Sequence, residues 1–283
     1  MEKSSQFLSG IHQRLQQLGL LADEDLPVAQ SLLLMAAAER EAFDLQPYEA
    51  QIVAMHDALT LVAAHPPLGE GASFHLDCLR KVIHDEYGYC GDSEAYEDPE
   101  HMNLISVMDR RRGIPVALGS LYLELARRQG WSVSGLNFPG HFLLRIEDGA
   151  QRIIFDPFDE GKVMQAQDLR QLLKKIMGDK AELHHHYYDA VTARHVVLRF
   201  CNNRKTRLIA REEYAAAMVI VANERLIAPN EPRLLFEAGM LSARLHQIQQ
   251  AITYMEEFIV CSKDRKAVAE AQEVLRGFRR LLQ

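Results

Sequence analysis

The stretch that decides the fold is GIPVALGSLYLELARRQGWSVSGLNFPGHFLLRI, residues 113–146, because its hydrophobic pattern changes period partway along. Apolar residues first recur at helical spacing from Pro115, which suits the first turn of a helix because no backbone hydrogen bond is lost there. Two arginines followed by Gly130 have the chemistry of a helix end. Apolar residues cover most of the girth of this helix, so we expect it to be central and buried.

After Gly130 the apolar residues alternate with a period of two, which is typical of β-strands. A turn of the hairpin kind, Glu147–Ala150, joins the last two strands. A symmetric turn of two or four residues there gives a register in which His141 lies directly opposite Asp156, within hydrogen-bonding reach. The three strands are predicted at Val133–Phe138, Phe142–Ile146 and Arg152–Asp156.

A buried helix, a strand with His141 and a further strand with Asp156 follow the chain order of a papain-like catalytic triad. In such a triad a Cys at the helix start gains thiolate character from the helix dipole, and the His acts as its base. The Asp orients the imidazole and stabilises its charged form. The order of elements therefore points to a cysteine-protease-like core.

Two blocks of the chain resemble the bacterial SirB/YchA family, whose members join a transglutaminase-like domain to tetratricopeptide repeats. These blocks are NLISVMDRRRGIPVALGSLYLELARRQGWSVSGLNFPGHFLLRI (103–146) and IIFDPFDEG (153–161). The resemblance covers nearly the whole chain and implies an α+β fold. We expect N-terminal helices packed on a papain/transglutaminase-like core, made of a central helix and a small antiparallel sheet, followed by an all-α tetratricopeptide-like tail.

The resemblance also implies which residues form the site. His141 and Asp156 match the family's His and Asp, but Gly113-Ile114-Pro115 stands where a transglutaminase-like chain has Gly-x-Cys. Pro115, or Val116 under a shifted alignment, thus occupies the nucleophile's position, and neither side chain can attack a carbonyl. His141 and Asp156 are then either a retained structural pair or part of a working pocket with Asn103.

Other candidates surround this core. The run Arg110–Arg112 precedes the helix start, where free N–H groups can hold an anion, although ion pairing with the acidic loop Asp92–Glu100 is the favoured interpretation. Gly140 shapes the entry to the strand of His141. Cys90 can approach the site only through tertiary folding, and a buried inert thiol is favoured. His184–His186 is interpreted as a solvated tract, and we expect no metal and no cofactor.

The C-terminal third contains an internal repeat. Tyr214 and Ala217 recur as Ile248 and Ala251, a spacing of 34 residues that is the tetratricopeptide period. We therefore predict two domains, a transglutaminase-like domain with a helical N-terminal part at 1–187 and a helical repeat domain at 188–283.

Composition limits the classes of function. The chain has 48% apolar and 25% charged residues, as an ordinary globular protein does. Residues 1–187 carry 28 acidic and 17 basic side chains, whereas residues 188–283 carry 11 and 15, a smaller basic excess than nucleic-acid binders usually have. We expect no secretory signal and no membrane span, and four cysteines without a CxxC pair favour a reducing cytoplasm.

Two functions compete on this sequence. The favoured one is a pseudoenzyme, a protein- or peptide-binding adaptor whose transglutaminase-like cleft lacks its nucleophile. The alternative is a hydrolase or acyl-transfer enzyme that uses His141 and Asp156 with a non-standard nucleophile. A nucleic-acid-associated factor rests only on the arginine run and the mildly basic tail.

Overall fold

The protein is described by a computed structural model, which covers residues 2–40, 42–64, 70–93, 98–99 and 102–282. Within it the chain packs as two compact units. The first, called here the sheet unit, consists of residues 22–36 and 44–200. The second, the helical unit, consists of residues 1–21, 37–43 and 201–283. The predicted boundary between residues 187 and 188 stays a prediction.

The central helix of the sheet unit is α6 (Pro115–Arg128), which begins and ends as predicted. Pro115 occupies its first turn, and Gly130 follows it with a left-handed backbone at φ 73°. Even Glu124, on the same helix, is only 1% exposed. Its carboxylate forms ion pairs with Arg127 and Arg128 at 3.1 and 2.8 Å. These partners offset the cost of burying the charge.

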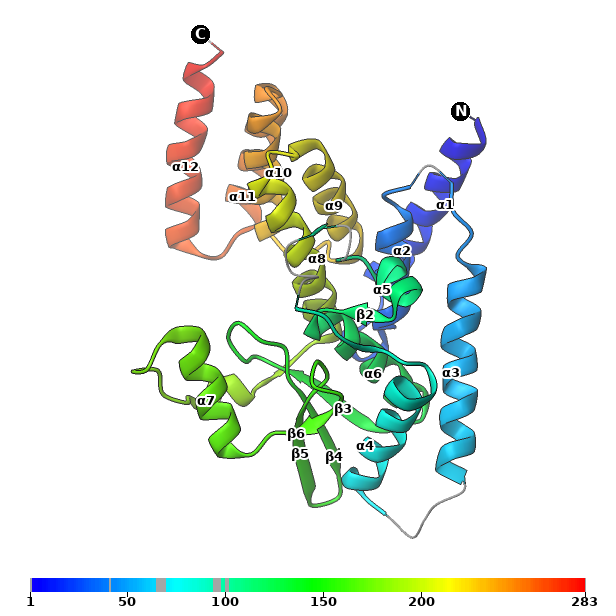
Figure 1. The fold of residues 1–283 in the computed structure, drawn as a ribbon. Coiled ribbons are helices and arrows are strands. Elements are labelled where there is room, and N and C mark those ends of the chain that lie inside the picture. The colour runs from blue at the N-terminus through cyan, green and yellow to red at the C-terminus, as the bar shows by residue number, and fades with distance from the viewer. Residues whose placement is uncertain (1, 41, 65–69, 94–97, 100–101, 283) are drawn as a thin grey trace. The chain divides into compact units, whose positions relative to one another are not determined.

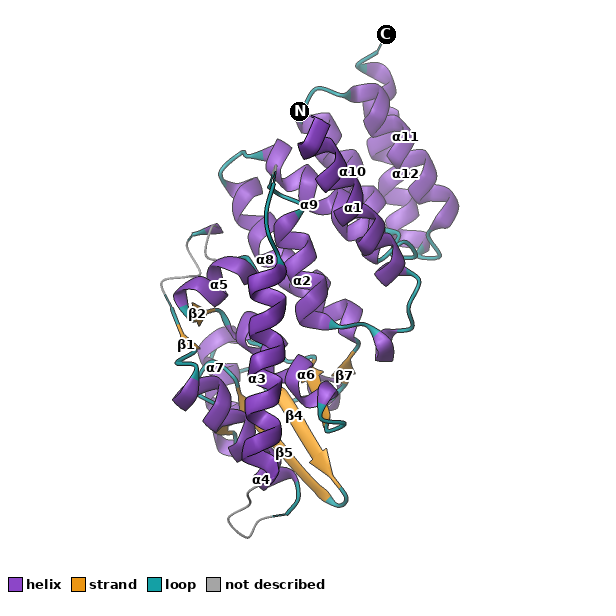
Figure 2. Ribbon diagram, turned by 90° about the vertical axis from the view of Figure 1, so that its right-hand side faces the viewer, coloured by secondary structure: helices purple, strands orange, loops and turns teal. Residues whose placement is uncertain are grey.

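Further helices cover this core. The helical spacing of Ile52, Met55 and Leu59 predicts a helix over Pro47–Ala64, which is found as α3 with these three residues buried. Helix α4 packs on the β4–β5 hairpin, and α3 packs on α4 and α6 (Figure 2). The sequence predicts one helix over Phe74–Glu86, and the structure has α4 followed directly by a six-residue π-helix. The remaining helix bounds are α2 Val28–Ala37, α3 Gln46–Ala64, α4 Ala72–Arg80, the π-helix Lys81–Glu86, α5 Leu104–Arg110 and α7 Ala166–Met177.

The sheet is small and antiparallel, as predicted, with the strand order β6-β5-β4-β3-β7. Helix α7 packs its buried residues Leu169 and Leu173 against Leu136 and Phe138 on one face of the sheet. A separate two-stranded parallel ladder joins β1 (Cys90–Gly91) to β2 (Arg112–Gly113). The five strands are β3 Ser132–Leu136, β4 Leu144–Asp148, β5 Gln151–Asp156, β6 Lys162–Val163 and β7 Ala190–Val191 (Figure 1).

The predicted register of the β4–β5 hairpin is wrong. Asp148 pairs with Gln151, so the turn is the two residues Gly149-Ala150, and Leu144 pairs with Phe155. The ladder begins only at Leu144, and His141 lies before it rather than opposite Asp156. The error is an even number of residues, which leaves every side chain on its predicted face. Gly149, with φ 55°, supplies the left-handed conformation that the tighter turn needs.

One aromatic side chain ties the sheet to α6. A Cβ atom on Gly119 of α6 or on Gly135 of β3 would lie 2.6 Å from the ring of Phe142 in each case. Both glycines therefore leave room for the ring between helix and sheet. Phe142 is the neighbour of His141, so this packing also fixes where His141 lies.

Two helices of equal length start 34 residues apart in the helical unit. These are α9 and α11, with 14 residues each, and Ala217 and Ala251 are both fully buried at equivalent positions. Each is followed by a partner helix, and Gly239 of α10 lies close to the backbone of Ala251. The helices are α1 Glu2–Gly19, α8 Ala193–Ala210 (its second half), α9 Tyr214–Ile227, α10 Arg233–Arg244, α11 Ile248–Cys261 and α12 Arg265–Arg280.

No helix among the described residues is long and apolar enough to cross a bilayer.

Candidate functional site

The predicted contact between His141 and Asp156 is present. The imidazole Nε2 lies 2.9 Å from both carboxylate oxygens of Asp156. The two side chains are 13% and 10% exposed, so the pair is largely shielded from water. Because an ionised carboxylate only accepts, Nε2 carries the proton and Nδ1 is the acceptor of the neutral ring.

Several contacts hold His141 in place although it lies outside the ladder. Arg199 donates to the backbone carbonyls of Phe138 and His141 at 3.1 and 2.7 Å. Its guanidinium also lies over the Phe142 ring, 5.3 Å from the centroid. Gly140 has φ 68°, in the left-handed region that a side chain disfavours, so the predicted role of Gly140 in shaping this entry has a physical basis. Together these contacts fix the position of the backbone that carries the His141 imidazole.

Asp156 is held just as firmly at the end of β5. Its Oδ1 accepts the backbone N–H of Phe158 at 2.9 Å, and its carbonyl accepts that of Gly161 at 2.9 Å. The Phe158 ring meets the imidazole of His141 edge to face, with centroids 6.1 Å apart. Asp156 therefore accepts two backbone N–H groups within the FDPFDEG block that the sequence singled out, one at Oδ1 and one at its main-chain carbonyl.

The start of α6 contains no nucleophile. Ile114 is the N-cap residue, and Pro115 and Val116 open the helix as buried side chains. Gly113 has little room for any side chain, since even a Cβ would lie 3.0 Å from Val107. Ser120, also buried, donates its hydroxyl to the Ala117 carbonyl at 2.6 Å. Gly113, Ile114, Pro115 and Val116 have no side-chain atom that could attack a carbonyl, and the Ser120 hydroxyl is fully buried.

The other candidates have structural partners. The Asn103 side chain caps α5, with Oδ1 accepting the Ser106 N–H at 2.9 Å. Arg112 is exposed and belongs to β2. No described contact links it to His141 or Asp156. Arg110 pairs with Asp92 at 3.3 Å, which agrees with the favoured interpretation of the arginine run. Residues 94–97 and 100 of the acidic loop lie outside the described residues.

Cys90 lies nearer the helix start than the sequence suggested. In β1 it pairs with Arg112, and the next residue, Gly91, pairs with Gly113 immediately before α6. Gly91 in turn packs against Phe158, which contacts His141. The thiol is partly exposed and free. Two-residue parallel pairing has almost no sequence signature, and the only signal was the pair of glycines around Cys90.

A second buried polar pair underlies the site. The His84 Nε2 lies 2.6 Å from the Tyr122 hydroxyl, and its Nδ1 lies 2.5 Å from the Tyr89 carbonyl. Since a carbonyl only accepts, Nδ1 carries the proton, and Nε2 accepts from Tyr122. Burial lowers the pKa of His84 and raises that of Tyr122, and the charge of Asp156 contributes to the latter. No sequence pattern pointed to this pair.

No group of three or more His, Cys, Asp or Glu side chains within the described part of the chain is arranged to hold a metal ion. His184 and His186 stack on each other with ring centroids 5.6 Å apart in an exposed turn.

The structure thus combines a buried central helix, a small antiparallel sheet and a His–Asp pair at the end of β5. The family model described as "Transglutaminase-like superfamily" matches residues 46–202, and the chain belongs to that superfamily. Relatives that match over most of their length include UPF0162 proteins. One from Xylella fastidiosa (strain Temecula1) is 25% identical over 86% of each chain. One from Vibrio cholerae is 30% identical over 68% of this chain and 71% of its own.

A shorter similarity extends beyond bacteria. Human F-box only protein 21 is 37% identical over 84 residues, which are 30% of this chain and 13% of that protein. No solved structure matches the chain significantly.

Proposed function

We propose that this protein is a non-catalytic, protein- or peptide-binding adaptor whose transglutaminase-like domain has lost its nucleophile. The observation that carries the proposal is Pro115 in the first turn of α6, where the class places its cysteine. Proline and the adjacent Val116 are buried and chemically inert. A His–Asp pair without a nucleophile retains recognition chemistry but not covalent catalysis.

The imidazole of His141 still has one atom to offer a ligand. Its Nε2 is taken by Asp156, whereas Nδ1 has no hydrogen-bond partner among the described residues and is not among their buried unpaired atoms. In the neutral ring Nδ1 accepts a hydrogen bond, so a backbone N–H or a hydroxyl of a bound segment fits it. Gly140 is exposed beside it, and the Ile176 side chain lies against this glycine.

The helical unit supplies a second surface in this proposal. We assign α9–α12 to two tetratricopeptide-like repeats on the grounds of the 34-residue offset and the close crossing at Gly239. The narrower SirB family name and a cytoplasmic location belong to the same proposal, and the four free cysteines support a reducing compartment.

The test compares two His–Asp pairs of the same unit. A pull-down from bacterial lysate would use the wild type, His141→Ala/Asp156→Ala, and His75→Ala/Asp148→Ala as the matched control. His75 and Asp148 are 3.8 Å apart, and His75 stacks on Trp131, beyond the C-terminal end of α6. This pair is therefore far from Pro115 at the start of α6 and mimics the chemical change alone. We expect a specific partner to be lost only with the first double variant, at equal Tm. A partner list that both double variants leave unchanged would overturn the proposal.

A second candidate function, acyl transfer from Cys90, is favoured only by the β1–β2 pairing beside Gly113. It predicts that an electrophile such as iodoacetamide alkylates Cys90 faster than the exposed Cys261, and that His141→Ala abolishes the difference. The adaptor proposal predicts the reverse order, because Cys90 is partly covered. Mass spectrometry of the two peptides decides between them.

A further inference from the structure

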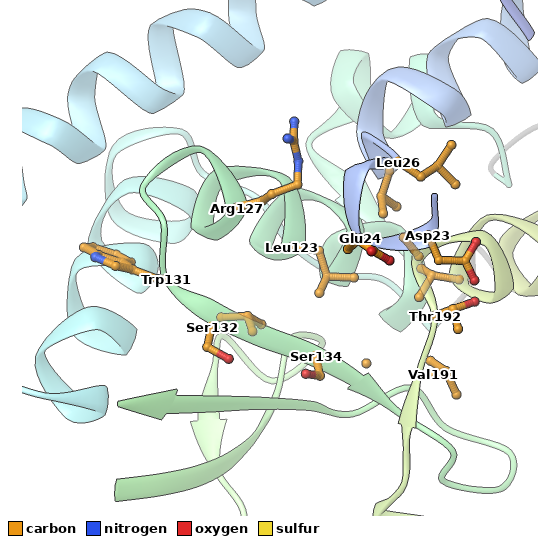
Figure 3. Close-up of a pocket in the computed structure, with 15 residues that line it drawn as sticks. Asp23, Glu24, Leu26, Leu123, Arg127, Trp131, Ser132, Ser134, Val191 and Thr192 are labelled. Atoms are coloured by element: carbon orange, nitrogen blue, oxygen red, sulfur yellow. The ribbon is translucent and has the colours of Figure 1, made fainter. Parts of the chain in front are cut away.

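A groove in the sheet unit lies apart from the His141–Asp156 pair and shares no residue with it. It has a volume of about 540 Å³, within the usual range for ligand sites. Four parts of the chain line it: the turn at Asp23–Glu24 with the start of α2, the second half of α6, strand β3, and the junction of β7 with α8 (Figure 3).

The groove follows an unpaired strand edge. The N–H of Leu136 donates to the carbonyl of Leu143 on the β4 side, whereas the N–H of Asn137 donates to the carbonyl of Asp189 on the β7 side. Backbone groups alternate along a strand, so Gly135 and Val133 also direct theirs toward β7. Gly135 is paired there with Val191, the last residue of β7. Val133, two residues earlier, has no backbone partner on this edge among the described residues.

Strand β7 pairs with only part of the β3 edge because helix α8 begins directly after it. Thr192 follows β7 directly, its Oγ1 accepts the N–H of His195, and its carbonyl accepts that of Val196. Both bonds are those of a helix N-cap, so α8 diverts the backbone after only two residues of strand. The N–H and C=O of Val133 are left at a partly exposed position that opens into the groove.

The walls of the groove have the chemistry of a side-chain pocket. Leu26 and Val196, which are 0% and 1% exposed, line the groove as its apolar floor, and Leu123 of α6 also lines it. Leu26 and Leu123 are labelled in Figure 3. Some of the charged side chains at the rim of the groove are ion-paired and one is not. Arg127 is paired with Glu124 and Asp23 with Arg194, whereas Glu24 is exposed and has no ion-pair partner among the described residues. The rim therefore presents one free negative charge.

We propose that this groove binds an extended peptide segment of a partner protein, which adds a short β-strand at Val133. The peptide's backbone would pair with the free N–H and C=O of Val133. One apolar side chain would enter the floor at Leu26, and a Lys or Arg would meet Glu24. Alternating apolar and basic residues suit this geometry because side chains of a strand alternate in direction. This site is independent of the function proposed for His141 and Asp156.

The experiment first selects peptide ligands and then tests variants in which the free backbone N–H of Val133 is removed. A display library of random linear octapeptides is selected against the full-length protein, and Kd values of selected peptides are measured by fluorescence anisotropy. We expect sequences that alternate apolar residues with Lys or Arg. Val133→Pro removes the free N–H without breaking a bond to β4, and it should weaken binding by about tenfold or more. Val133→Thr keeps the N–H and serves as the matched control.

Two further measurements test the proposal even if the Val133→Pro variant does not fold. N-methylation of the selected peptide at alternate residues should weaken binding only at residues whose N–H faces β3. Glu24→Lys should weaken binding severalfold, and a Lys→Glu change in the peptide should restore it. The proposal is overturned if no peptide is selected, if N-methylation at every position is harmless, or if binding is lost in His141→Ala/Asp156→Ala instead.

Discussion

The two units each bury an ionisable side chain, but they satisfy it differently. In the sheet unit both ring nitrogens of His84 are hydrogen-bonded, to the Tyr89 carbonyl and the Tyr122 hydroxyl. In the helical unit Glu224 is fully buried, and one oxygen lies 2.6 Å from the Lys205 Nζ. Its other oxygen is buried without a hydrogen-bond partner among the described residues.

The difference gives the two units opposite responses to pH. Burial lowers the pKa of His84 and raises that of Glu224 from 4.5 to about 7, in each case because the charged form is desolvated. His84 thus stabilises its unit when the solution is neutral, and Glu224 stabilises its unit when the solution is acidic. Lys205 also pairs with Glu237, so a single cation serves two carboxylates. A fully satisfied neutral network tolerates burial better than a partly satisfied ionic one.

The largest expected effect comes from removing that cation. Lys205→Met leaves Glu224 and Glu237 without their shared partner, and at pH 8 we expect it to cost the helical unit about 3–5 kcal/mol. Hydrogen exchange of α9 and α10 amides measures the loss, with α6 amides as the internal reference. The loss should be smaller at pH 5, where Glu224 becomes neutral.

Arg233→Met is the matched control for this change, because Arg233 also pairs with Glu237, at 3.0 Å, but is half exposed. We expect it to cost less than about 1 kcal/mol. Equal losses for the two variants would mean that burial does not distinguish the two cations and would remove the basis of the comparison.

The next effect is the pH dependence that Glu224 imposes. Its folded-state pKa of about 7 lies above the ordinary value of 4.5, so its contribution is complete below pH 4.5 and is lost as the pH rises through 7. The helical unit should lose about 3 kcal/mol over this window from this group alone. Glu224→Gln should lack this loss in hydrogen exchange measured between pH 5 and 8. Parallel profiles for the two proteins would show that Glu224 stays ionised throughout.

Neither of these buried networks was predicted from the sequence, although much of the fold was. The span of α6, the three strands and the stripe of α3 follow from local periodicity and end signals, which a short window of sequence contains. The contact between His141 and Asp156 was predicted through a wrong register. It survives because Phe142, between Gly119 and Gly135, and Arg199 position the His141 backbone without any help from the ladder.

What could not be predicted depends on residues that meet only after folding. His84 and Tyr122 are 38 residues apart, and Lys205 lies 19 residues from Glu224. The two-residue ladder that brings Cys90 beside Gly113 is too short to have a hydrophobic period. The free edge at Val133 depends on where α8 begins, and Thr192 was not recognised as its cap.

A smaller effect tests the network of the sheet unit. Tyr122→Phe removes the hydroxyl that donates to His84 and leaves Nε2 buried and unpaired, which we expect to cost about 1–3 kcal/mol. Tyr48→Phe is the control, since its hydroxyl donates to Asp109 at an exposed site. Urea-induced unfolding, monitored by hydrogen exchange of α6 amides, compares the free energies of unfolding of the two variants. If the Tyr48 variant lost as much as the Tyr122 variant, burial of the His84 network would carry no special cost.

The smallest effect is the acid response of the sheet unit. Because the folded-state pKa of His84 lies below its ordinary value of 6.5, its contribution is complete above pH 6.5 and is lost as the pH falls through the folded-state value. His84→Gln should therefore flatten the acid limb of the stability of α6 amides, while His185→Gln, at an exposed position, should leave it unchanged. The helical unit must show the opposite slope in the same samples, because Glu224 gains a proton where His84 resists one. A common slope in both units would mean that a surface charge effect, and not the two buried groups, sets the pH dependence.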